Sequence, residues 1–343
     1  MAGSSSVPAT TARGSSSRRR YARWIPWLLA AAVLASVIFI ALHYSEGREF
    51  AKMLEEAKPS WLIVAVRLQA ATYAAQGEVF RAAVQERSLS RWWLYQLSLA
   101  KLFLDQALPS GGITSTVLAA AALEQKGISR AAAVSSAAIN LVSYHTGYVV
   151  ALAVAVLFIG LFGPSATLIL IFAGLFLLFG IGLTVVILLL AGRRTAPWRK
   201  VLRLPVLKHM VDFVKETDPQ IMRDPKLLAE VTLWQIAIFL LDAATMWVLI
   251  RSLGTSAPVV AVFASFTVSS LFRTMGIVPG GLGTYEAASI FTLRAIGLNF
   301  PLALSATLLF RGLSFWLPML PGLWFSRRVT RGYNRSPQTS GER

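Results

Sequence analysis

Five of the ionisable side chains inside the long apolar stretches of this 343-residue sequence are candidate site residues. They are Arg67, Asp242, Arg273, Glu286 and Arg311. A charge at the centre of a membrane helix costs about 2.5 to 3.5 kcal/mol on insertion, so such residues mark candidate sites. Arg311 lies deepest in its stretch, and we expect it either to face a cavity and bind an anion or to form an ion pair with Glu286 or Asp242. Glu286 either serves that cavity or has a structural role, in which it caps its helix or pairs with Arg273. Arg67 either faces the cavity or contacts another helix.

Two proline-glycine clusters interrupt stretches that would otherwise form continuous helices. The first contains Pro109, Gly111 and Gly112, and the second contains Pro279, Gly280, Gly281 and Gly283. Proline removes a backbone donor and clashes with the preceding turn, while glycine admits positive φ. In hydrocarbon, such a break persists only where protein or water covers it. We therefore expect both clusters to line a cavity, where helix N-termini present N–H groups to an anion such as a lipid phosphate. Two proline kinks between ordinary short spans are the alternative.

The rest of the sequence supplies the helices that must position these residues. It is 55% hydrophobic and 14% charged, and a spanning helix needs roughly 20 mainly apolar residues. Full spans are expected at residues 25–42, 59–84, 131–162, 166–191, 227–250 and 302–325. The stretches 92–123 and 258–293 contain the two clusters, and each predicts a re-entrant helical hairpin. The expected fold is all-α, a polytopic membrane protein with about six full spans and two re-entrant hairpins.

Residues 59–162 and 227–325 form an internal repeat. A shift of 170 residues superimposes two sets of prolines and glycines: Pro109, Gly111 and Gly127 on Pro279, Gly281 and Gly297. Residues 166–191 add one crossing between the copies, so the copies would run in opposite directions through the bilayer. Inverted repeats of this kind are typical of transporters, whose substrate site lies at the repeat interface near the midplane.

The basic residues predict the orientation of the chain. The net charge is +17, and 23 of the 33 lysines and arginines fall in segments on one side of the expected topology. This bias places both termini in the cytoplasm, beside an anionic leaflet that attracts basic segments. Topology accounts for the charge, so no nucleic-acid partner is expected.

The expected organisation has three parts. Disordered basic tails cover residues 1–23 and 329–343, and a single transmembrane domain covers 24–328. Within this domain, the first repeat (59–162) is followed by a linking span (166–191), a cytoplasmic loop (193–226) and the second repeat (227–325).

Motifs for catalysis are absent from the sequence. There is no cysteine, and the sequence has no phosphate-binding GxxxxGK[ST] motif and no HExxH zinc motif. We therefore expect no cofactor, no metal and no enzymatic activity.

The segment Pro279 to Glu286, followed by Arg311 and Leu317-Pro318, resembles the lysylphosphatidylglycerol synthase transmembrane, or flippase-like, family. The resemblance covers roughly residues 25–328 and implies a bacterial inner-membrane protein that moves a lipid between leaflets. Synthase members carry a soluble aminoacyl-transferase domain after the membrane region, and this sequence ends at Arg343 without one, so lysyl transfer is not expected.

The leading hypothesis is therefore a translocase for an anionic or polar-headed lipid. The alternative is an accessory or scaffold protein of a lipid or cell-envelope pathway that transports nothing. A homodimer and a lipid-modifying enzyme are the possible protein partners.

Overall fold

The computed structural model describes residues 55–86, 89–108, 113–162, 174, 178, 217–222, 224–274 and 279–333. Within these ranges the chain is helical and contains no strand, which confirms the all-α prediction for this part of the chain. The expected spans at 25–42 and 166–191, the tail 1–23, most of the loop 193–226, and Pro109, Gly111 and Gly112 lie outside the described residues.

The helices occur in the same order twice. The first set is α3 (Pro59–Val84), α4 (Arg91–Ala107), α5 (Ile113–Glu124) and α6 (Arg130–Phe162). After the short α9 (Pro219–Met222), the second set is α10 (Pro225–Ser252), α11 (Val259–Thr274), η3 (Pro279–Gly281), α12 (Thr284–Ala295), α13 (Phe300–Arg311), η4 (Gly312–Trp316) and α14 (Leu317–Tyr333).

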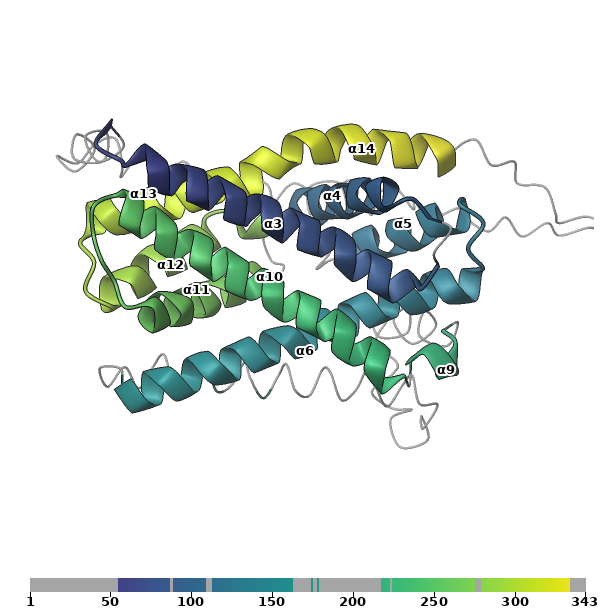
Figure 1. Cartoon of the computed structure of the whole chain (residues 1–343), viewed down its shortest axis with the longest axis horizontal. Helices are drawn as coiled ribbons and strands as arrows, with labels where there is room; N and C mark the ends of the chain where they lie inside the picture. The colour runs from purple at the N-terminus through teal and green to yellow at the C-terminus, as the bar shows by residue number, and fades with distance from the viewer. Residues whose placement is uncertain are drawn as a thin grey trace, which may run out of the picture.

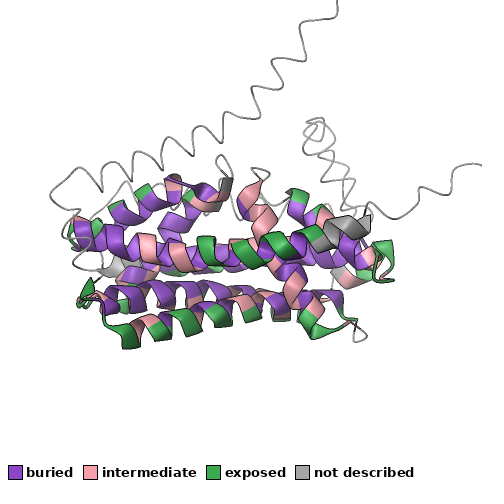
Figure 2. Cartoon of the chain, turned by 90° about the horizontal axis from the view of Figure 1, so that it is seen from above, coloured by how far each residue is buried: buried purple, intermediate pink, exposed green. Residues whose placement is uncertain are grey.

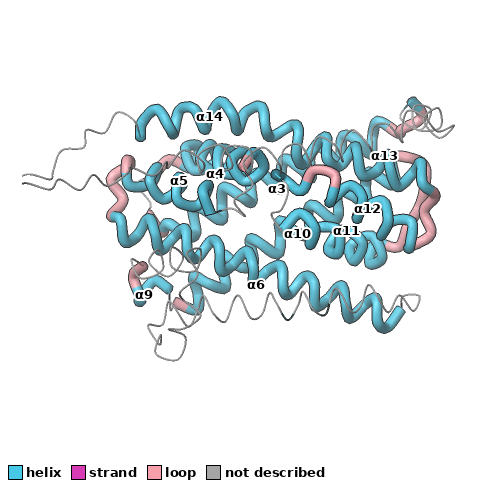
Figure 3. The backbone as a smooth tube through the Cα atoms, turned by 180° about the vertical axis from the view of Figure 1, so that it is seen from behind, coloured by secondary structure: helices cyan, strands magenta, loops and turns pink. Residues whose placement is uncertain are grey.

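The 170-residue shift found in the sequence also relates these helices. It carries α5 to residues 283–294, against 284–295 for α12, and it carries α6 to residues 300–332, against 300–333 for α13 to α14. Gly127 and Gly297 close the equivalent turns with φ of +88° and +99°, a conformation that glycine adopts without strain. The pair α4 and α5 and the pair α11 and α12 lie at opposite ends of the molecule (Figures 1 and 3).

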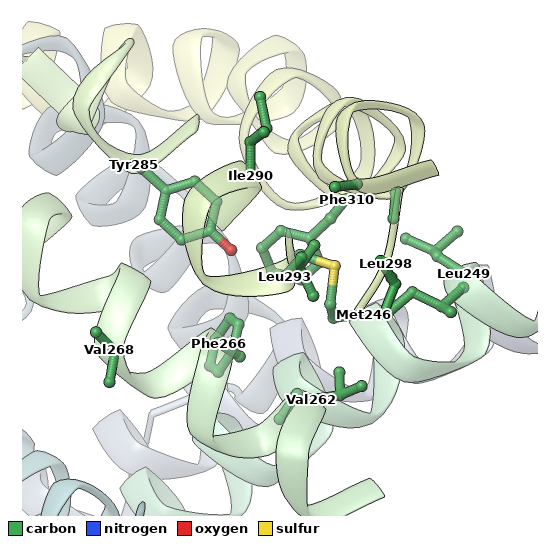
Figure 4. Close-up of a cluster of buried hydrophobic side chains, with 14 of the residues drawn as sticks. Met246, Leu249, Val262, Phe266, Val268, Tyr285, Ile290, Leu293, Leu298 and Phe310 are labelled. Atoms are coloured by element: carbon green, nitrogen blue, oxygen red, sulfur yellow. The ribbon is translucent and has the colours of Figure 1, made fainter. Parts of the chain in front are cut away.

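The first helices of the two sets, α3 and α10, pack along each other through the middle of the molecule, while α6 and α14 flank opposite edges (Figure 1). Buried and exposed positions alternate along the helices, so that each helix presents one buried face (Figure 2). The largest apolar cluster joins α10, α11, α12 and α13 (Figure 4). At its centre, the rings of Phe266 and Phe310 meet edge to face with centroids 5.6 Å apart.

Local sequence signals explain where two helices of the second repeat begin. Asp224 caps α10 by accepting the backbone N–H groups of Lys226 (2.9 Å) and Leu227 (3.3 Å). Asn299 caps α13 by accepting the N–H of Leu302 (3.0 Å). In both helices a proline occupies the first turn, where its missing donor is not needed.

Small and hydroxylated residues hold the helices close together. A β-carbon at Gly322 would lie 2.7 Å from the carbonyl oxygen of Leu99, so α14 and α4 pack backbone against backbone. The hydroxyl of Thr292 on α12 bonds those of Ser265 (2.7 Å) and Ser269 (2.9 Å) on α11. These contacts join α12 to α11.

Among the described residues, three helical segments are long and apolar enough to cross a membrane: Arg130–Leu157, Pro225–Ser252 and Phe300–Arg327. The first two coincide with expected spans, and the third corresponds to the span expected at 302–325. Helix α14 continues to Tyr333, so the structure corrects the boundary of the C-terminal tail: residues 329–333 are helical because they extend the preceding helix. Large apolar side chains such as Leu320 (73% exposed) and Phe291 (64% exposed) cover the outer faces, as expected for surfaces that contact lipid.

Candidate functional site

A cavity of about 230 Å³ lies between the two repeats. Its lining comes from α3, α4, α5 and α6 of the first set and from α10, α11, Gly280 and Ser314 of the second. The volume is many times the 10 to 15 Å³ that a single water requires by this kind of measure. Amide, hydroxyl and charged side chains dominate the lining: Gln69, Thr72, Tyr73, Gln76, Ser98, Lys101, Asp105, Gln106, Thr116, Asn140, Tyr144, His145, Gln235, Asp242, Arg273 and Ser314.

Arg273 brings a guanidinium to this lining. It lies in the last turn of α11, and its stem passes over Gly281, where a β-carbon would approach the Cα of Arg273 to 2.8 Å. Its guanidinium has no hydrogen bond or ion pair within the part of the chain that the structure describes. Lys101, the other cation of the lining, already pairs with Asp105 (2.7 Å). Arg273 therefore offers its donors to an occupant of the cavity.

The carboxylates of the lining have partners on neighbouring helices. Asp242 on α10 is buried and accepts a hydrogen bond from the Gln69 amide on α3 (3.3 Å). Asp105 on α4 accepts a hydrogen bond from Ser115 in the first turn of α5 in addition to its pair with Lys101. Each carboxylate thus joins two helices at the wall of the cavity.

A π-helical turn completes the wall. At η4 the regular hydrogen-bond ladder is interrupted, and the carbonyl oxygens of Leu313 and Ser314 accept bonds from side chains instead. Tyr73 donates to the first, and the Gln106 amide donates to the second (3.3 Å). Single π-turns of this kind occur often at functional sites.

Arg311 lies outside the cavity lining, in a buried ion pair. Its Nε donates to Glu286 Oε1 (2.6 Å), and one terminal nitrogen donates to the carbonyl of Gly280 (3.0 Å). The guanidinium also stacks on the ring of Phe315, 4.1 Å from the centroid. Of the two roles considered for Arg311, the structure places it in the ion pair, because Glu286 occupies the direction in which an anion would approach.

Glu286 also determines what the N-terminus of α12 can bind. Its Oε2 accepts the N–H of Gly283 (2.6 Å), so a carboxylate of the chain itself occupies the helix end. The expectation that this end presents N–H groups to a ligand anion is therefore wrong for α12. Glu286 pairs with Arg311 and not with Arg273, and its role is to hold the second cluster in shape.

The remaining predicted site residues are divided between the cavity and other places. Gly280 lines the cavity with φ of +56°, whereas Gly281 and Gly283, also at positive φ, shape the turn outside the lining. Pro279 begins η3. Arg67 is exposed on α3 and is not among the residues that line this cavity.

Of the glutamines of the lining, Gln76 was considered from the sequence together with Arg67, and three others were not identified. Gln69, Gln106 and Gln235 are uncharged, and each was treated as an ordinary residue of an apolar stretch. The available signal was that a buried amide in a membrane helix must find hydrogen-bond partners, which marks it almost as clearly as a charge. Among the described residues, no group of three or more histidines, aspartates and glutamates is placed to hold a metal.

A family model described as the lysylphosphatidylglycerol synthase TM region matches residues 27–322. The chain belongs to this family. The match confirms the resemblance expected from the Pro279 cluster, and with the three long apolar helices it identifies a multi-pass membrane protein. It concerns the TM region of the synthase family and includes no catalytic domain.

A stretch of 108 residues is also 28% identical to the UPF0104 membrane protein PH1989 of Pyrococcus horikoshii. The aligned stretch covers 32% of this chain and 32% of that protein, so the chain spans about a third of this relative's length.

Proposed function

We propose that this member of the lysylphosphatidylglycerol synthase TM region family is a lipid translocase. It moves an anionic or polar-headed lipid between the leaflets of the bacterial inner membrane, with both termini in the cytoplasm. The six full spans and two re-entrant hairpins expected from the sequence are part of this proposal.

The observation that carries the proposal is the polar cavity between the repeats, with an unpaired Arg273 in its wall. A buried guanidinium inside a membrane domain is expensive unless it has a partner or lines a water-filled path. Both halves of the chain contribute to the cavity, as expected for a substrate site at a repeat interface. A lipid phosphate would supply the acceptors that Arg273 lacks, because guanidinium binds phosphate through two parallel hydrogen bonds.

The end of α4 meets the second proline-glycine cluster at this point. A β-carbon on Gly280 would lie 3.2 Å from the carbonyl oxygen of Gln106, at the end of α4. A head group in the cavity would thus contact both repeats at once. Rearrangement of one repeat against the other would then change the side from which the head group is accessible.

Reconstitution of the purified full-length protein into liposomes tests the proposal. Fluorescent lipids in the outer leaflet are quenched by dithionite, so translocation appears as additional quenching over time. We expect wild-type protein to accelerate movement of anionic lipids over protein-free vesicles. Arg273→Gln should reduce that rate by between about tenfold and about a hundredfold, the range for losing a hydrogen bond to a charged group.

Arg67→Gln is the matched control, because it removes an arginine that is exposed and outside the cavity. Its rate should equal that of wild type. A wild-type rate equal to that of empty vesicles for every anionic and polar-headed lipid would reject the proposal and favour the accessory role.

A further inference from the structure

We infer that the cavity takes up one proton with each anionic lipid that it binds, on the carboxylate of Asp242. The lipid and the proton then cross the membrane together, which makes the protein a symporter. The inference rests on the proposed function and adds a second transported ion to it.

The charges of the cavity wall balance only while the cavity is empty. Its lining contains four charged side chains, of which Lys101 and Asp105 neutralise each other in an ion pair (2.7 Å). Among the described residues no ion pair joins the other two, Asp242 and Arg273, but they interact electrostatically. An anionic lipid that binds Arg273 takes the positive charge that balances Asp242. One uncompensated negative charge is then left in the cavity.

Asp242 is the side chain on which this excess charge can be removed. It lies on α10 and is 5% exposed, and its neighbours on α3, Gln69 and Thr72, are uncharged. Two negative charges close together in a site of low dielectric favour protonation of one of them. The proton adds to a carboxylate oxygen of Asp242, forms an O–H bond and cancels one charge. Anion binding and proton binding therefore favour each other, as thermodynamic linkage requires.

The amide of Gln69 can serve both protonation states of Asp242. Its nitrogen donates to the ionised carboxylate (3.3 Å), and its oxygen is buried and has no partner among the described residues. An amide carries donors and an acceptor, so a half-turn of this group presents the oxygen to the O–H of a protonated Asp242. The buried acid thus keeps a hydrogen-bond partner in either state, which avoids the cost of an unpaired polar group.

The proton can travel between solvent and Asp242 through the cavity. Water reaches the lining, because the side chains of Lys101 and Asp105 are 20% and 28% exposed. The volume of about 230 Å³ leaves room for water beside the wall. The proton comes from this water, and it returns to water on the other side when the lipid leaves and the O–H bond breaks.

Other titratable side chains surround Asp242. From the helices beside α10 they are Tyr73 on α3, Tyr144 and His145 on α6, Arg273 on α11, Tyr285 on α12 and Arg311 on α13. Phenol and guanidinium groups ordinarily titrate well above neutral pH, and Arg311 is held by Glu286 (2.6 Å). His145 is the member of this set that ordinarily titrates near neutral pH. The experiment therefore has to distinguish His145 from Asp242.

The experiment measures the distribution of a trace of fluorescent phosphatidylglycerol between the leaflets of liposomes that contain the full-length protein. A final dithionite pulse reports the outer leaflet once the distribution is constant. In the first condition the lumen is about one pH unit more alkaline than the outside, and valinomycin in equal K⁺ concentrations holds the membrane potential at zero. Coupling to one proton should raise the ratio of inner to outer lipid by up to about tenfold.

In the second condition the pH is equal on both sides. A K⁺ concentration about tenfold higher inside, with valinomycin, makes the lumen negative, and this potential acts on any net charge that crosses. The pair of lipid anion and proton carries no net charge, so the wild-type ratio should not change.

Asp242→Asn keeps the shape of the side chain and can still accept from Gln69, but it cannot take up the proton. This variant should lose the response to pH and gain the response to potential, so that the negative lumen lowers the ratio by up to about tenfold. His145→Gln and Asp105→Asn remove the histidine and the other carboxylate of the lining. Both should keep the wild-type distributions, which do not depend on how fast each variant moves lipid.

Failure of this inference can be told apart from failure of the function on which it rests. If the lipid moves no faster than in protein-free vesicles in either condition, the proposed translocase function fails. If wild-type protein moves the lipid but its distribution ignores the pH gradient, translocation stands and proton coupling is overturned, whatever the variants do. Loss of the pH response in His145→Gln or Asp105→Asn, or its retention in Asp242→Asn, would overturn the assignment of the proton to Asp242.

Discussion

Removing Arg311 should unfold the second proline-glycine cluster rather than abolish ligand binding. Arg311 and Glu286 are 3% and 2% exposed in their side chains and are joined by a 2.6 Å bond. Arg311→Met would leave the Glu286 carboxylate buried without its cation. Breaking a buried pair in this way costs about 3 to 5 kcal/mol, which corresponds to a fall in melting temperature on the order of 10 °C.

A double variant separates the ion pair from its other contacts. In Arg311→Met with Glu286→Gln, the uncompensated charge is gone and the amide oxygen can still accept the N–H of Gly283. The remaining loss is mainly the bond from Arg311 to the carbonyl of Gly280, about 1.5 to 3 kcal/mol for a charged donor. The double variant should therefore be more stable than Arg311→Met alone.

Intrinsic fluorescence during heating of the detergent-purified protein measures both effects, because the chain contains ten tryptophans. Arg294→Met is the matched control: Arg294 is exposed and contacts only the ring face of Phe300 at 6.0 Å. Its loss should change stability by about 0.5 kcal/mol or less. The reasoning is refuted if Arg311→Met melts like Arg294→Met but translocates no lipid, since Arg311 would then act on the ligand.

Two glycine substitutions test the packing around the site by the same melting assay. Gly280→Ala should be strongly destabilising, because the backbone there has a φ of +56° and the new β-carbon would lie 2.2 Å from a ring carbon of Phe315. In the control Gly297→Ala the β-carbon meets nothing within 4 Å, so this variant should show only the milder cost of a positive φ. Equal melting temperatures of the two variants would contradict the close packing at Gly280. Gly322→Ala should separate α14 from α4 and lower stability, while Gly312→Ala in the same long helical segment has open space and should be neutral or slightly stabilising. Equal melting of these two variants would show that the close contact of Gly322 with α4 does not limit stability.

Apolar length and the proline-glycine breaks predicted most of the fold because both are local properties. Residues 59–84 were expected to form one span, and the helix α3 has the same bounds, although it is not among the three segments that are long and apolar enough to cross a membrane. The second break separates α11 from α12 as expected, since proline and consecutive glycines cannot continue a helix. The end of α14 was misplaced because the basic residues after Phe325 suggested a solvated tail, yet arginine is a good helix former and extends an existing helix.

The candidate site was predicted less completely because it depends on contacts between distant segments. The charged residues chosen from the sequence included Arg273, Glu286 and Arg311. The sequence alone did not show which of the two arginines lies beside the acid. Glu286 precedes Arg311 by 25 residues and lies against it only because the turn at Asn299 folds α13 back along α12. Among the described residues no carboxylate forms an ion pair with Arg273, although Asp242 in the same cavity wall interacts with it electrostatically. For this reason the sequence ranked Arg273, whose guanidinium is unpaired, below Arg311 as a candidate site residue.

The internal repeat explains where the cavity lies. The 170-residue shift relates Glu286 and Arg311 to Thr116 and Leu141 in the first repeat, and both of these residues line the cavity. Where the second repeat fills the space beside its hairpin with a buried ion pair, the first repeat has a small hydroxyl and an apolar side chain. Those residues leave the corresponding space open. The cavity is thus the place where two copies of one architecture differ in sequence, and substitutions that restored an ion pair at Thr116 and Leu141 would close it.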